Sequence, residues 1–187
     1  MTVPVQNLPA LVKRSAVYLT AFFLLLMIYG CPYSSVYKID TEPQYQTEET
    51  YTGKWATIAT DENGRQRPVK MILSINNDYE YDLCFTGYFD ELNNCNIAVN
   101  DTIRGTAFMS VVDSRKFFNI KIKGENYISE VIYEDGKLSL LPLCEHFTTK
   151  IVKSDAELKR AVLLHFKTRL YPLYDEPFCL REMVKVN

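Results

Sequence analysis

The chain has 187 residues, a formal net charge of −2 and a high aromatic content, with 13 tyrosines and 10 phenylalanines. This length suits one globular domain, and the abundance of strand-forming residues argues against a disordered chain. The mildly acidic balance excludes the basic surface that nucleic-acid-binding domains need, so no nucleic acid partner is expected.

The N-terminal residues have the pattern of an export signal. Lys13 and Arg14 precede an apolar run, Ser15–Gly30, of 16 residues. As a helix this run would be about 24 Å long, which is short for a bilayer core of roughly 30 Å. A positive cluster followed by a short apolar run is typical of a secretory signal peptide, so residues 1–30 are predicted to be removed.

The residues around the expected cleavage point, Ile28-Tyr29-Gly30-Cys31, resemble the lipobox of bacterial lipoproteins. The resemblance implies cleavage after Gly30 and acylation of Cys31, whose acyl chains would hold the protein on a lipid bilayer. Pro32 follows, and no acidic residue of the kind linked to inner-membrane retention stands there, which favours the periplasmic face of the outer membrane. Two alternatives stay open: an uncleaved signal anchor with a free Cys31, and a plain cleaved signal.

Residues 31–50 are polar and show no hydrophobic period, so they are predicted to be a tether ahead of a folded domain at 51–187. From Tyr51 on, apolar and polar residues alternate in successive short runs, which is typical of an antiparallel sheet with one buried face. Asn63-Gly64 and Asp135-Gly136 are hairpin-turn signals, and the longest loop is expected at 87–101. The predicted strands cover residues 51–60, 69–77, 79–85, 102–112, 116–123, 126–134, 137–143 and, as a short addition, 147–152.

One helix is predicted late in the chain. Ser154 and Glu157 form a capping-box pattern, a single apolar stripe follows, and Pro172 marks the end of the helical region. A last strand is expected at 178–186. The predicted fold is therefore mostly β: an antiparallel meander that closes into a barrel or half-barrel, with one C-terminal helix followed by a final strand.

Gly53 and Trp55 stand in the first predicted strand of this meander. Together with the late helix and returning strand, this Gly-x-Trp resembles the lipocalin, or wider calycin, superfamily of eight-stranded barrels. The resemblance implies that an arginine covers the Trp, and Arg181, in the last strand, is the candidate. A Trp that simply fills a core is the alternative interpretation.

Four cysteines follow Cys31. In an exported chain an even number is compatible with two disulfides. The preferred pairing is Cys84 with Cys95 and Cys144 with Cys179, but four cysteines allow three pairings, and ordinary buried thiols are an equal alternative.

The aromatic side chains suggest one binding function. Tyr79, Tyr81 and Phe85 share a strand face, and Phe118 shares another with Ile120 and Ile122. In an open barrel these rings would line a pocket for a small apolar ligand, whereas in a filled barrel they would be core. The alternative is a structural or interaction module with a filled core that binds another envelope protein. A filled interior would eliminate the carrier, whereas an opening of roughly several hundred Å³ would favour it.

No enzyme, cofactor or metal site is expected. The chain has two histidines, His146 and His165, without the spacing of a metal site, and His165 falls on the apolar stripe of the predicted helix, where a packed role is expected. No nucleophile motif or glycine-rich phosphate loop is present in the sequence.

Overall fold

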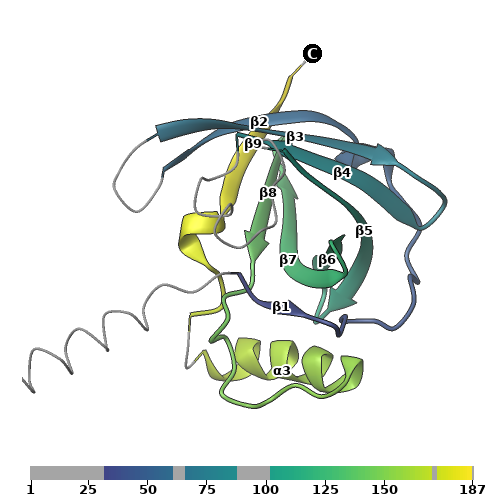
Figure 1. Ribbon diagram of the computed structural model, residues 1–187, viewed down its shortest axis with the longest axis vertical. Helices are drawn as coiled ribbons and strands as arrows, with labels where there is room; N and C mark the ends of the chain where they lie inside the picture. The colour runs from purple at the N-terminus through teal and green to yellow at the C-terminus, as the bar shows by residue number, and fades with distance from the viewer. Residues whose placement is uncertain (1–31, 61–65, 88–101, 170–171, 187) are drawn as a thin grey trace, which may run out of the picture. The chain divides into compact units, whose positions relative to one another are not determined.

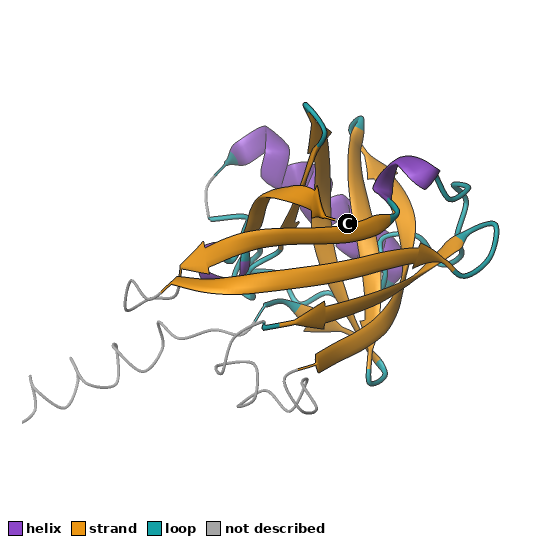
Figure 2. Ribbon diagram, turned by 90° about the horizontal axis from the view of Figure 1, so that it is seen from above, coloured by secondary structure: helices purple, strands orange, loops and turns teal. Residues whose placement is uncertain are grey.

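The computed structural model describes residues 32–60, 66–87, 102–169 and 172–186. Antiparallel strands β2 to β9 form a closed barrel: the sheet order runs β7-β6-β5-β4-β3-β2-β9-β8, and β8 pairs again with β7. Figure 2 shows the same strands from above. This confirms the predicted fold class. The barrel strands are β2 (Gly53–Thr60), β3 (Gln66–Ile75), β4 (Glu80–Thr86), β5 (Thr102–Val112), β6 (Arg115–Ile122), β7 (Glu125–Glu134), β8 (Lys137–Pro142) and β9 (Leu180–Val186).

The alternation of side chains builds the barrel core. On β3, Val69, Met71 and Leu73 all point inward and are each 1% exposed, while the residues between them face solvent. Ile75, predicted on the same face, is 43% exposed because it lies at the end of its strand. Successive side chains of a strand point to opposite faces, so eight such strands enclose one continuous apolar core.

The hairpin between β7 and β8 turns as its sequence predicts. Asp135 and Gly136 have φ angles of 52° and 75°, and positive φ at both central residues matches the twist of the strands they join. The Asn63-Gly64 turn and most of the 87–101 loop lie outside the described residues.

Helix α3 (Asp155–Thr168) lies outside the barrel, on the same side as β1 (Figure 1). The Ser154 side chain accepts a hydrogen bond from the Glu157 amide at 3.2 Å, which confirms the predicted N-cap. The carboxylate of Glu157 reaches the amide of Lys153 rather than that of Ser154. Leu158 on the buried side of α3 joins a second apolar core with Phe117, which points outward from β6. The additional strand predicted at 147–152 does not form.

The predicted tether is wrong for its first part, because residues 32–40 pack onto the barrel. Strand β1 (Ser34–Ser35) pairs with the beginning of β7, and the Ile39 amide donates to Asn119 Oδ1 at 2.7 Å. Ile39 itself is 1% exposed. β8 pairs with β7 only from Ser129 onward, so the start of β7 keeps a free edge that β1 covers. An unpaired edge exposes main-chain donors and acceptors, which explains why this polar segment is ordered there.

The predicted disulfide between Cys144 and Cys179 is also wrong, since both are free thiols. The Cys144 sulfur contacts the carbonyl of Pro172 at 3.0 Å, and the Cys179 sulfur contacts that of Asp175 at 3.4 Å, so each is engaged within its own surroundings. Cys84 is free as well. Its predicted partner, Cys95, lies outside the described residues.

Candidate ligand-binding site

One end of the barrel, here called the closed end, is covered by the short helix η1 (Glu49–Tyr51). The Tyr51 ring lies edge-on to Tyr81, Phe118 and Tyr133, with centroid separations of 6.1 to 6.5 Å. The main-chain carbonyl of Tyr51 accepts a hydrogen bond from the Trp55 indole at 2.8 Å. Edge-to-face rings pack densely, so aromatic side chains fill this end of the interior.

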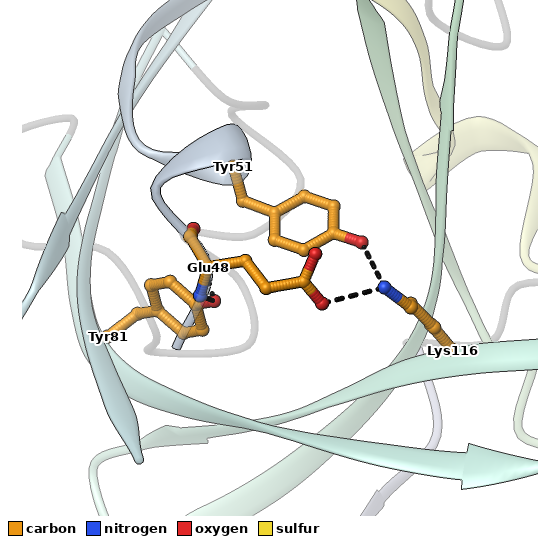
Figure 3. Close-up of polar contacts among 4 residues, drawn as sticks. All are labelled: Glu48, Tyr51, Tyr81 and Lys116. Carbon is orange, nitrogen blue, oxygen red and sulfur yellow. Dashed lines mark hydrogen bonds and ion pairs between the residues drawn. The ribbon is translucent and has the colours of Figure 1, made fainter. Parts of the chain in front are cut away.

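A cluster of hydrogen-bonded polar side chains, here called the clasp, holds η1 in place (Figure 3). Its members are Glu48, Tyr51, Tyr81 and Lys116. Lys116, which points inward from the start of β6, donates to Glu48 Oε1 at 2.7 Å and to the Tyr51 hydroxyl at 2.8 Å. The Glu48 amide donates to the Tyr81 hydroxyl at 2.5 Å. Residues from the segment before β2, from β4 and from β6 thus meet over the closed end.

Two groups of the clasp have raised pKa values. Partial burial disfavours the charged form of Lys116, but its bonds to Glu48 and Tyr51 outweigh that effect and raise its pKa above the ordinary 10.5. Burial likewise raises the pKa of Tyr81. Both groups therefore keep their protons throughout the neutral range, and the hydrogen bonds that fasten η1 persist there.

The cation over Trp55 is Lys185, not the predicted Arg181. The Lys185 ammonium lies 5.5 Å from the centroid of the Trp55 ring, and the two residues pair across β9 and β2. Arg181 is instead exposed and binds Glu176 with one guanidinium nitrogen, at 3.0 and 2.9 Å from its two oxygens. The backbone of Glu182, at φ 49°, interrupts the alternation of β9 and turns Arg181 outward.

Gly53 is needed for this arrangement. A Cβ atom at this position would lie 2.4 Å from Cε of Lys185, so the missing side chain is what lets the lysine pass over the ring. The backbone there has φ 130°, a conformation that essentially only glycine adopts. The Gly-x-Trp pattern therefore has a physical explanation in this barrel.

The opposite end, here called the open end, contains a partly open cavity of about 60 Å³. It lies where β4, β6 and β8 finish and where β5, β7 and β9 begin. Its walls are almost entirely apolar. The lining residues are Pro32, Phe85, Ile103, Ile120, Ile122, Tyr127, Ser129, Leu140, Pro142 and Leu180.

The four predicted pocket residues separate in the structure. Phe85 lines the cavity, whereas Tyr81 and Phe118 belong to the core at the closed end. Tyr79 precedes β4 and is 41% exposed, so its prediction as a pocket residue is wrong. Ile120 also lines the cavity, and the sequence placed it on the same strand face as Phe118. Alternation predicts that such an apolar side chain is buried, but it does not predict whether the side chain lines a cavity.

The size of the cavity limits what it can hold. A site for one water needs about 10–15 Å³, so 60 Å³ accommodates four or five water-sized groups. Sites for larger ligands usually enclose about 300–1,000 Å³. The interior is thus neither completely filled nor as open as the carrier hypothesis expected, and the remaining space suits only a short length of alkyl chain.

A buried polar cluster on the outer face of the barrel has a structural role. Arg115 pairs with the buried carboxylate of Glu130 at 3.0 Å, and its guanidinium lies 4.3 Å from the centroid of the Phe166 ring. The Tyr174 hydroxyl donates to the same carboxylate, and burial together with this bond raises the pKa of Tyr174 far above its usual value. The cluster ties α3 and the segment before β9 to the barrel.

The histidines lie apart from both ends of the barrel interior. His165 is buried on α3 against Phe166, as its place on the apolar stripe predicted, and His146 is exposed. Within the described ranges, no group of three or more His, Cys, Asp or Glu side chains could hold a metal ion.

None of the helices in the described part of the chain is long and apolar enough to cross a membrane. The segment predicted as signal peptide and Cys31 lie outside the described residues. Comparisons with protein-family models, with curated proteins and with solved structures find no match to this chain.

Proposed function

We propose that the protein is a non-enzymatic envelope lipoprotein, anchored through Cys31, whose barrel binds a narrow apolar group such as an alkyl chain. The observation that carries the ligand assignment is the apolar cavity at the open end, about 60 Å³ in volume. The lipobox-like sequence before Cys31 supports the anchor.

The affinity follows from the depth of insertion. Burying one methylene contributes about 0.8 kcal/mol, so four or five buried carbons contribute about 3–4 kcal/mol, which corresponds to a Kd in the millimolar range. Carbons that rest on the partly open mouth of the cavity add to this. Straight chains should bind in preference to sterols, because a fused ring system is wider than the space available.

Titration with decanoate tests the proposal, with binding followed by calorimetry or by NMR shifts. Ile122→Phe places a larger side chain in the cavity wall and should weaken decanoate binding at least 10-fold. Ile58→Phe is the matched control, because Ile58 is 65% exposed on the outside of β2. The ligand assignment is overturned if the wild-type protein does not bind decanoate, or if the two variants bind it equally well.

A second candidate, an interaction module, is favoured by an apolar strip on the outside of the barrel. Ile72 and Val186 flank Lys54 on neighbouring strands, and Val184 pairs with Ala56 next to them. The three apolar side chains are 38% to 49% exposed. Neighbouring exposed apolar side chains are typical of protein interfaces. This candidate is preferred if decanoate does not bind and if Ile72→Lys abolishes cross-linking to one defined envelope protein.

A further inference from the structure

Pro32, the first residue that the structure describes, lies at the rim of the cavity. Pro32 is one of the residues that line the cavity, and it bridges to Cys144 just beyond the end of β8. The next residue, Tyr33, donates its amide to the carbonyl of Leu143 at 2.8 Å. The chain is therefore pinned to the open end of the barrel from the first residue after Cys31.

This attachment leaves no spacer between the proposed anchor and the domain. Neighbouring Cα atoms are about 3.8 Å apart, so an acylated Cys31 stays within one residue of the cavity wall. A free 19-residue segment at 32–50 could have extended roughly 60 Å and placed the barrel far from the lipid. The packing of residues 32–40 removes that freedom.

The closed end must then lie away from the anchor. Strands β2, β4, β6 and β8 run from the closed end to the open end, and β6 contains 8 residues. At about 3.3 Å per residue and with the usual strand tilt of roughly 40°, the turns at the closed end lie roughly 20 Å from the open end. The Asp135-Gly136 turn and the Lys116 clasp belong to that distant end.

We propose that the open end of the barrel rests on the bilayer surface, with the mouth of the cavity facing the lipid and η1 facing away. This inference depends on the anchor in the proposed function. The alkyl chain bound in the cavity would then be that of a membrane lipid, which enters from the bilayer without crossing water. Transfer through water would expose each methylene of the chain to solvent, and a mouth in contact with the bilayer avoids that exposure.

Lysine footprinting of the anchored protein tests this orientation. The lipid-modified protein is extracted from membranes, reconstituted into phosphatidylcholine vesicles and labelled with a water-soluble amine-reactive reagent. Lys121 and Lys123 are exposed at the open end, in and beside the turn between β6 and β7. Lys54 and Lys137 are exposed at the closed end.

In vesicles, labelling of Lys121 and Lys123 should fall at least threefold relative to the protein in detergent, while labelling of Lys54 and Lys137 should not change. A variant with 20 Gly and Ser residues inserted between Cys31 and Pro32 keeps the anchor but should lose the protection. If the wild-type protein does not float with the vesicles, the proposed anchor is wrong. If it floats but all four lysines label as in detergent, the anchor stands and the orientation is wrong.

Discussion

Replacing Gly53 with alanine tests how Trp55 is covered. The new Cβ would lie 2.4 Å from Cε of Lys185, and the backbone would have to keep φ 130°. A non-glycine residue in this region costs about 1–3 kcal/mol. Lys185 can also move aside, because its side chain is flexible, but it would then lose a cation–π contact worth about 0.5–1 kcal/mol. Gly53→Ala should therefore lower the free energy of unfolding by about 2–4 kcal/mol.

A double-mutant cycle separates the two contributions, with urea unfolding followed by the fluorescence of Trp55, the single tryptophan of the chain. In the Lys185→Ala background the steric conflict is absent, so Gly53→Ala should cost about 0.5–1 kcal/mol less than in the wild type. A loss below 0.5 kcal/mol for Gly53→Ala alone would show that the backbone at this position is not restrictive. Equal losses in both backgrounds would refute the role of Gly53 in admitting Lys185.

Three further changes probe the clasp, the sheet and a buried thiol. Lys116→Met removes two hydrogen bonds at a partly exposed site and should cost about 1–2 kcal/mol in urea unfolding; a neutral effect would show that η1 closes the barrel without it. Gly105→Ala would place Cβ 2.3 Å from a main-chain carbonyl oxygen of β6, which cannot move aside as a side chain can, so a loss above 3 kcal/mol or failure to fold is expected, and a loss below 1 kcal/mol would contradict the strand spacing. Burial raises the pKa of Cys179 to about 12, whereas an unfolded thiol ionises near 8.5. Because the folded pKa is the higher one, stability is retained below about pH 8.5 and lost as pH rises toward 12, so wild type should lose about 2 kcal/mol more than Cys179→Ala between pH 7 and pH 10; parallel pH curves would contradict this.

Short-range patterns predicted the parts of this fold that depend on short-range physics. The alternation around Met71 predicted a strand with one buried face because side chains of a strand alternate regardless of what lies opposite. Ser154 predicted the start of α3 because a cap satisfies amides only two or three residues away. Asp135-Gly136 predicted its hairpin for the same local reason.

The errors at Arg181 and at the two cysteines concern residues whose surroundings come from distant parts of the chain, whereas the error at Tyr79 is one of strand boundary. Arg181 does not cover Trp55 because the register of β2 and β9 pairs Trp55 with Lys185, four residues further along β9. The predicted disulfide between Cys144 and Cys179 is wrong because it was inferred from the even number of cysteines and their order in the chain. Neither of these observations gives the direction of a thiol in the folded protein. Tyr79 was assigned to the interior because the predicted alternation began one residue before β4 starts at Glu80.

The amino-acid order alone was enough to identify the eight barrel strands, the late helix and the buried face of strands such as β3, since these follow from periodicity within a few residues. The packing of residues 32–40, the lysine over Trp55 and the size of the cavity were decided only when the barrel closed. Each depends on which strands become neighbours and on how much volume eight sets of inward side chains leave unfilled. The cavity volume is the small difference between the internal volume of the barrel and the summed volumes of the inward side chains. It therefore cannot be predicted from any single segment of the chain.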